Sequence, residues 1–182
     1  SYYEKIFGKC STLMMNMIKN NKPIIAVIDG VATAVGCQLI SSCDLAYCSS
    51  NAMFATPGIN IGLFCSTPMV PLSRNVNKKA AMEMLLTGDL INAHKAQQIG
   101  LINNVFSSEK LMEEVTEVAL KISSKSMKTL KIGKRAFYQQ REMSVKEAYD
   151  FTSNLMVDNM LNEDSEEGIN AFLEKRKPVW KD

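Results

Sequence analysis

One stretch, residues 23–45, most constrains what this chain can fold into. It opens with five consecutive apolar residues, 24–28, which have the length and β-branched content of a strand buried on both faces. Asp29-Gly30 then marks a turn, and the small residues within 32–36 would let the backbone approach a neighbour or a ligand closely. From Val35 onward the apolar residues recur at helical spacing. The stretch therefore predicts a strand, a tight turn and a helix.

The start of that helix has a chemical consequence. The first amides of a helix have no intrahelical partner, and the helix dipole adds partial positive charge there. A helix that begins near Val35 would direct backbone N–H groups at any oxygen lying over the small-residue turn. An anion or a developing oxyanion is held in this way. An ordinary strand-to-helix turn packed with small residues explains the same pattern.

Composition excludes several classes of protein. The 182 residues fit one domain, and 46% hydrophobic and 22% charged residues are typical of a globular chain. A formal net charge of +2, without basic residues interleaved with aromatics before the C-terminus, predicts no nucleic-acid partner. No apolar run reaches membrane-spanning length, so no membrane partner is expected. Five cysteines, mostly within apolar patterns, favour reduced thiols in an intracellular compartment.

Further motifs follow residues 30–39 (GVATAVGCQL) in order along the chain. They are CDLA at 43–46, FATPGINIG at 54–62, LTGDLINA at 86–93, GLI at 100–102 and GINAFLEKRK at 168–177. Together these motifs resemble the crotonase, or enoyl-CoA hydratase/isomerase, superfamily over nearly the whole chain. Gln38, the segment 54–58 and the segment 62–68 most resemble one particular branch of that family.

The resemblance implies a fold. We expect an α/β protein with a crotonase-like spiral core of ββα units in residues 1–124, followed by a C-terminal helical trimerisation region in 125–182. It further implies that the family's N-terminal strands, with the first oxyanion-hole amide and part of the adenine pocket, precede Ser1. The residue pattern itself predicts a helix start at Thr67-Pro68 and a last helix over residues 165–176.

The resemblance also assigns catalytic positions. The Val35 backbone N–H matches an oxyanion donor, and Gln38 and Gly58 stand where family hydratases carry two glutamates. Hydration of an enoyl thioester needs groups that activate water and deliver a proton. A glutamine cannot exchange a proton at neutral pH, and glycine has no side chain. Family isomerases place acids at the second position or where Asn60 and Ser66 stand here, so every matched position is non-ionisable.

Other residues are expected to contact an acyl-CoA ligand. By resemblance these substrate-binding residues are Ala34, Gly36, Pro57, Phe64, Cys65, Phe172 and Lys175. The last two match an adenosine-phosphate site, often completed across a subunit boundary, although the basic run 175–177 also fits a solvated helix end. A Cys65–His94 nucleophilic pair is an alternative that no local signature supports. The cysteine and histidine spacing predicts no metal site, and we expect no cofactor.

These observations lead to a functional expectation with alternatives. The leading one is an acyl-CoA-binding member of the family that polarises a thioester carbonyl and is weak or inactive as a hydratase. A thioesterase or decarboxylase type of acyl-CoA enzyme and a non-catalytic structural or regulatory trimer remain open, as do the mitochondrion and the cytoplasm. Apolar stripes on the last helices, including Phe151, Leu155 and Met156, predict a homotrimer or a hexamer.

Overall fold

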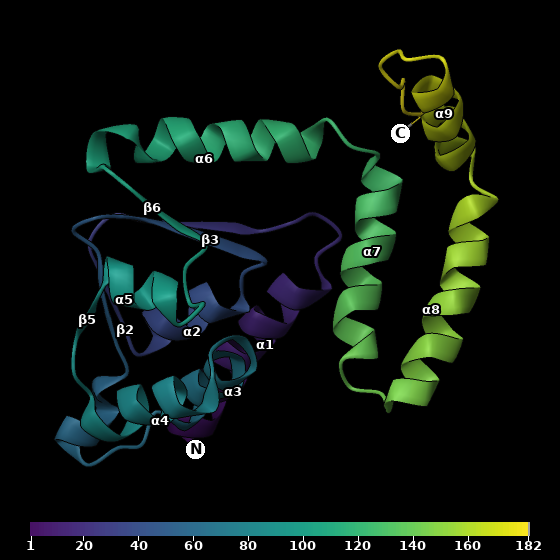
Figure 1. Cartoon of the computed structure of the whole chain (residues 1–182). Helices are drawn as coiled ribbons and strands as arrows, with labels where there is room; N and C mark the ends of the chain where they lie inside the picture. The colour runs from purple at the N-terminus through teal and green to yellow at the C-terminus, as the bar shows by residue number, and fades with distance from the viewer. Residues whose placement is uncertain (182) are drawn as a thin grey trace. The chain divides into compact units, whose positions relative to one another are not determined.

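A computed structural model describes residues 1–181 (Figure 1). The chain divides into two compact units, each with its own internal contacts. Unit 1 consists of residues 1–20 and 24–119, and unit 2 consists of residues 21–23 and those from 120 onward.

Two three-stranded sheets form the centre of unit 1. In the first, β1 (Ile25–Ile28) pairs in parallel with β3 (Leu45–Ser49), and β3 pairs in parallel with β6 (Asn104–Phe106). In the second, β2 (Val31–Thr33) pairs in parallel with β4 (Met53–Ala55), and β4 pairs antiparallel with β5 (Ile91–Asn92). The chain thus crosses between the two sheets four times, at the connections β1–β2, β2–β3, β3–β4 and β5–β6.

The strand β2 departs from the sequence prediction. Residues 32 and 33 were expected to belong to the small-residue turn, yet residues 31–33 pair with β4 so that Val31 lies opposite Met53 and Thr33 lies opposite Ala55. Three residues carry too little periodicity to reveal a strand, and the pairing partner lies about twenty residues further along the chain. The tight turn is therefore confined to Ala34.

Helices cover the two sheets of unit 1. The helical elements are α1 (Tyr2–Lys19), α2 (Val35–Ser42), the 3₁₀ helix η1 (Pro57–Ile61), α3 (Ser66–Asn75), α4 (Lys78–Thr87), α5 (Ala93–Gln98) and α6 (Ser108–Ser123). The predicted start of α3 was wrong, because the helix begins at Ser66 with Cys65 at the cap, which places Pro68 at the third position. A proline is tolerated there because the first-turn N–H groups have no intrahelical acceptor.

The core of unit 1 lies between the sheets and their helices. On one face of the first sheet, Ala46 and Cys48 of β3 are buried in a cluster that includes Cys37 and Ile40 of α2. On the other face, Tyr47 packs with Leu111 and Val115 of α6, and its ring stacks on that of Phe106. Phe54 and Leu72 are almost completely buried. This packing fixes the start of α2 against β2 and β4.

Unit 2 is helical. It contains α7 (Met127–Gln140), α8 (Val145–Met160) and α9 (Glu163–Leu173), and α8 contacts both α7 and α9 (Figure 1). The predicted last helix, 165–176, is displaced, because α9 begins at Glu163 and ends at Leu173, before the basic run. Lys175 has a positive φ of 55°, which a helix cannot accommodate.

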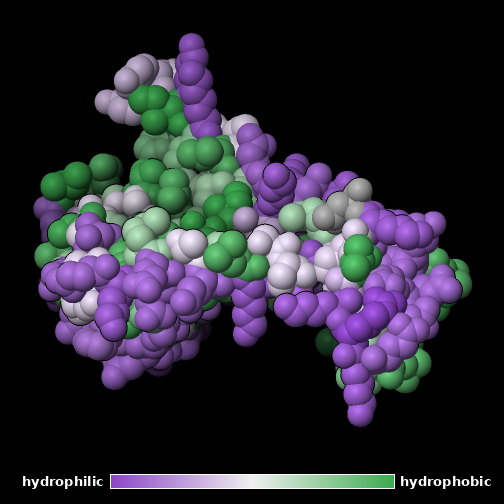
Figure 2. Space-filling model, turned by 90° about the horizontal axis from the view of Figure 1, so that it is seen from above, coloured by the Kyte–Doolittle hydropathy of each residue, from purple (hydrophilic) through white to green (hydrophobic). Residues whose placement is uncertain are grey.

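Large apolar side chains remain exposed on both units, and they give green areas on the surface in Figure 2. On α8 and α9 these include Tyr149, Met156, Val157, Phe172 and Leu173. Such surfaces are common at subunit contacts, and the trimer stays a prediction. Within residues 1–181, no helix is both long enough and apolar enough to cross a membrane.

Candidate functional site

The turn into α2 is built on Ala34. Its φ of 48° and ψ of −110° lie outside the regions that alanine normally adopts, and the structure holds it there by a hydrogen bond from the Ala34 N–H to the Ala55 carbonyl oxygen at 3.0 Å. The Ala34 carbonyl in turn accepts from the Gln38 N–H at 3.0 Å and starts the helix. Sparsely populated backbone conformations of this kind cluster at functional sites.

Val35 is the first residue of α2, and its side chain is half exposed. In the part of the chain that the structure describes, the Val35 N–H donates to no protein acceptor. Gly36 follows it, and a Cβ at Gly36 would lie 3.4 Å from the Ala32 Cβ, so α2 packs closely on β2. The result is an unused backbone donor at the positive end of a helix, framed by small side chains.

Gln38 lies one turn further along α2, with only 3% of its surface exposed. Its Oε1 accepts from the Cys10 thiol of α1, with 3.6 Å between sulfur and oxygen. This hydrogen bond holds the amide in place, and a glutamine amide cannot exchange a proton at neutral pH. Cys10 was not anticipated, because a cysteine within an amphipathic helix carries no signal that distinguishes it from a packing residue.

Gly58 lies in η1 beneath the loop that leads to α3. Its N–H donates to the Cys65 Sγ at 3.3 Å, and its carbonyl accepts from the Leu63 N–H at 2.9 Å. A Cβ added at Gly58 would lie 2.6 Å from the Leu63 carbonyl oxygen and 2.9 Å from the Cys65 Sγ. The loop therefore occupies the space that a side chain at position 58 would need.

The buried thiols are not poised as nucleophiles. Burial raises the pKa of Cys37 to about 11, with a smaller increase from the nearby Cys65, and the Cys37 thiol donates to the Ala32 carbonyl oxygen at 3.1 Å. Burial also raises the pKa of Cys48 to about 11. A thiol with so high a pKa is protonated at neutral pH. All five cysteines are free thiols.

The structure gives no support to the Cys65–His94 pair. Cys65 is 7% exposed and its sulfur accepts from Gly58, whereas His94 is exposed in the first turn of α5. No hydrogen bond joins the two side chains among the described residues. Across residues 1–181, no three histidine, cysteine, aspartate or glutamate side chains gather as metal ligands would.

The expected site residues fall into three groups. The first group lies at the start of α2 and consists of Ala34, Val35, Gly36 and Gln38. The hydrogen bond from Ala34 to Ala55 links this group to β4, the strand that leads into Pro57 and Gly58. Phe64 and Cys65 close the loop over Gly58, where Phe64 is 40% exposed. Phe172 and Lys175 belong to unit 2, where both are exposed. Leu63 was not predicted as a site residue, because its backbone N–H and carbonyl, and not its side chain, contact Gly58.

Comparisons with known proteins agree with this architecture. A family model described as enoyl-CoA hydratase/isomerase matches residues 3–182. Enoyl-CoA hydratase domain-containing protein 3, mitochondrial, from rat is 48% identical over 179 residues, which cover 98% of this chain and 60% of the rat protein. A probable mitochondrial enoyl-CoA hydratase from Dictyostelium discoideum is 35% identical over 91% of this chain and 60% of its own length. The chain thus spans about 60% of the length of these curated relatives.

Solved structures give the same result. The crystal structure of human enoyl-CoA hydratase domain-containing protein 3 matches with a TM-score of 0.95 and 48% identity, over 98% of this chain and 71% of that one. An enoyl-CoA hydratase from Mycobacterium smegmatis matches with a TM-score of 0.96 and 45% identity, over 98% of this chain and 70% of that one. The predicted fold class and the predicted branch, that of enoyl-CoA hydratase domain-containing protein 3, are both confirmed. The chain belongs to the enoyl-CoA hydratase/isomerase family and has the crotonase fold.

Proposed function

We propose that this chain binds acyl-CoA thioesters and polarises the thioester carbonyl with the Val35 N–H, while hydrating enoyl-CoA poorly or not at all. The observation that carries the proposal is that two features occur together in the site. An unused N–H lies at the first position of α2, and both positions where family hydratases carry glutamates lack an ionisable group.

The Val35 donor suits a carbonyl oxygen that gains negative charge. A helix N-terminus provides aligned N–H groups and a favourable dipole, and one such donor is worth about 3–4 kcal/mol to a developing oxyanion. The strained Ala34 backbone aims this amide, because the bond to Ala55 fixes the turn before the helix begins. A rigid donor needs no reorganisation when the ligand arrives.

Hydration needs more than polarisation. A general acid or base contributes roughly 100- to 10,000-fold to a rate, and an enzyme lacking both groups loses most of its hydratase activity. Gln38 engages the Cys10 thiol, and Gly58 is enclosed by its own loop. Thioesterase or decarboxylase chemistry remains the enzymatic alternative, because both can use the same oxyanion donor with less help from acids and bases.

Assembly and location form part of the proposal. The exposed apolar residues on α8 support a homotrimer or a pair of trimers, in which the partners are copies of the chain itself. No cofactor is required, because the CoA thioester itself carries the reacting group. The names of the rat and Dictyostelium relatives include the word mitochondrial, which favours the mitochondrion over the cytoplasm for this chain.

Calorimetry with a matched pair of ligands tests the proposal. Butyryl-CoA carries the thioester carbonyl, whereas S-butyl-CoA is the thioether that lacks it. We expect both to bind, with butyryl-CoA about 2- to 10-fold tighter, because one hydrogen bond contributes about 0.5–1.5 kcal/mol. Equal affinity for butyryl-CoA and S-butyl-CoA would show that the chain does not contact the thioester carbonyl. Absence of binding to either ligand would favour the non-catalytic trimer. Release of free CoA from butyryl-CoA would favour the thioesterase.

A further inference from the structure

The segment after α9, residues 174–181, is held in one conformation by the ion pair between Arg176 and Glu167. We propose that Arg176 is a positioning residue, and that its contact with Glu167 fixes this segment so that Lys175 presents its ammonium group to a phosphate of the CoA ligand. The inference rests on the proposed function, and it adds the residues that orient the phosphate contact.

Lys175 occupies a conformation that usually belongs to glycine. Its φ of 55° is left-handed, and it lies immediately after the cap residue Glu174, where helices most often end in glycine. The Lys175 N–H donates to the Phe172 carbonyl and the Arg176 N–H donates to the Ala171 carbonyl at 2.9 Å, which closes the helix end. A lysine persists in this conformation only where its surroundings impose it.

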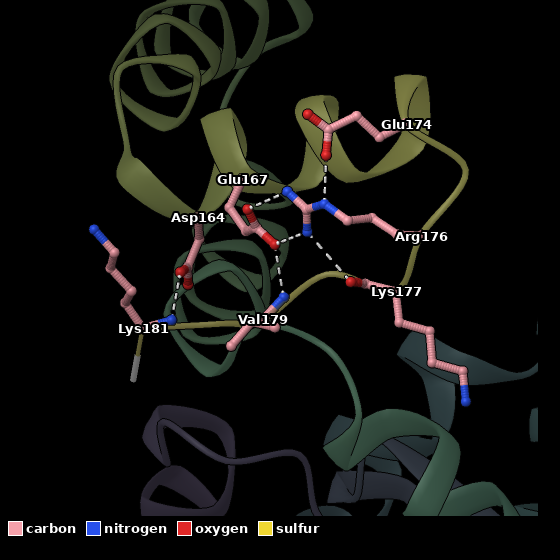
Figure 3. A network of polar contacts seen from close by, with 7 residues as sticks. All are labelled: Asp164, Glu167, Glu174, Arg176, Lys177, Val179 and Lys181. Carbon is pink, nitrogen blue, oxygen red and sulfur yellow. Dashed lines mark hydrogen bonds and ion pairs between the residues drawn. The ribbon is translucent and has the colours of Figure 1, made fainter.

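The guanidinium of Arg176 supplies part of that constraint. Its two terminal nitrogens contact the two carboxylate oxygens of Glu167 at 2.6 and 2.9 Å, and its Nε contacts Glu174 Oε2 at 2.5 Å (Figure 3). A fourth bond runs from the same guanidinium to the Lys177 carbonyl oxygen at 3.3 Å. This planar two-point geometry is one that lysine cannot reproduce. The ion pair therefore locks the residue directly after Lys175 onto α9.

The rest of the segment is tied to the same helix. Glu167 also accepts from the Val179 N–H at 2.8 Å, and Asp164 accepts from the Lys181 N–H at 3.0 Å (Figure 3). Between these two, the Trp180 indole donates to the Ser124 carbonyl oxygen at 2.8 Å and packs beside Gly168. Arg176 lowers the pKa of Glu167 to about 2, so the pair stays charged at neutral pH.

This arrangement separates the roles of the three basic residues in the run 175–177. Arg176 has its charge matched by Glu167 and Glu174, so it is not the cation offered to a ligand. Lys175 and Lys177 are exposed, and among the described residues neither ammonium group has a protein acceptor. Phe172, at 82% exposure, lies one turn before Lys175. An exposed aromatic ring and a lysine at one helix end suit the base and the phosphate of a nucleotide.

Calorimetry on the full chain with CoA, dephospho-CoA and pantetheine tests the inference. Lys175→Gly keeps the left-handed conformation but removes the ammonium group, and should weaken CoA binding about tenfold or more. Arg176→Ala and Glu167→Gln leave Lys175 in place but free to move, and should weaken CoA binding about 2- to 10-fold. Arg176→Lys should fall between Arg176→Ala and the natural chain. Lys177→Ala, the matched control for charge, should bind as the natural chain does.

Pantetheine distinguishes positioning from a damaged fold. None of these substitutions should change its affinity, because pantetheine lacks the nucleotide phosphates. A loss that persists with dephospho-CoA places the contact at the pyrophosphate, and a loss confined to CoA places it at the 3′-phosphate. The inference is overturned if Arg176→Ala and Glu167→Gln bind CoA as tightly as the natural chain does, or if these substitutions weaken pantetheine binding as much as CoA binding. It is also overturned if Lys177→Ala weakens CoA binding as much as Lys175→Gly does. A natural chain that binds none of the three ligands would instead remove the proposed function, and the inference with it.

Discussion

Replacing Gly58 with alanine tests the packing that sets this chain apart from a glutamate-bearing hydratase. The added Cβ would lie 2.6 Å from the Leu63 carbonyl oxygen and 2.9 Å from the Cys65 Sγ, both closer than ordinary contact. The sulfur belongs to a side chain, but the carbonyl is backbone held by its own loop, so the loop between Gly58 and Cys65 must shift. Overpacking of this kind destabilises a protein by about 1–3 kcal/mol.

Chemical denaturation of the natural chain and of Gly58→Ala measures this difference directly. Gly8→Ala is a matched control, because Gly8 lies within α1 and a Cβ there meets nothing within 4 Å. The control should raise the free energy of unfolding, by up to about 1 kcal/mol, since alanine favours helix. In a Cys65→Ala background, Gly58→Ala should lower the free energy of unfolding by less, because only the contact with the Leu63 carbonyl remains. Equal stability of Gly58→Ala and the natural chain would refute the steric reasoning, and a glutamate at position 58 would then be feasible.

Three further expectations concern other parts of the chain. Because the pKa of folded Glu167 is about 2 against an ordinary 4.5, its stabilisation is complete above about pH 4.5 and is lost as the pH falls toward 2. Trp180, the only tryptophan, should report this loss as a change in fluorescence that Glu167→Gln abolishes. Phe54→Ala should lower the free energy of unfolding by about 3–5 kcal/mol in denaturant titration, because the ring is fully buried. Gln38→Glu should leave crotonyl-CoA hydration near background. Burial should raise the pKa of the new carboxyl group, so the thermal stability of this variant should fall as the pH rises above about 4.3.

Sequence patterns predicted most of the helices and strands but missed β2 and η1. The apolar run before Asp29 and the helical spacing after Val35 located β1 and α2, because each pattern is local and repeats several times. β2 and η1 escaped notice because they are held by contacts with distant residues. α9 ends three residues before the predicted end, because Lys175 adopts a left-handed conformation that sequence periodicity does not record.

The site shows the same division. Matching motifs identified Val35, Gln38 and Gly58 by position, and the structure confirms that Val35 begins a helix. What surrounds them was not predictable, because the Cys10 thiol and the Leu63 carbonyl reach the site from other segments. To match the family hydratases, the chain would need glutamates at both position 38 and position 58. The space around Gly58 adds an obstacle that only the packed loop reveals.

Infrared difference spectroscopy of crotonyl-CoA labelled at the thioester carbonyl, bound to this chain, tests the central claim most directly. A hydrogen bond from the Val35 N–H draws electron density toward the carbonyl oxygen and lowers the stretching frequency of the carbon–oxygen bond. The account predicts a carbonyl band shifted to lower frequency that then persists, with the enoyl signal intact through a long incubation. An unshifted band would contradict polarisation at Val35, and rapid loss of the enoyl signal would show that another acid completes the hydration.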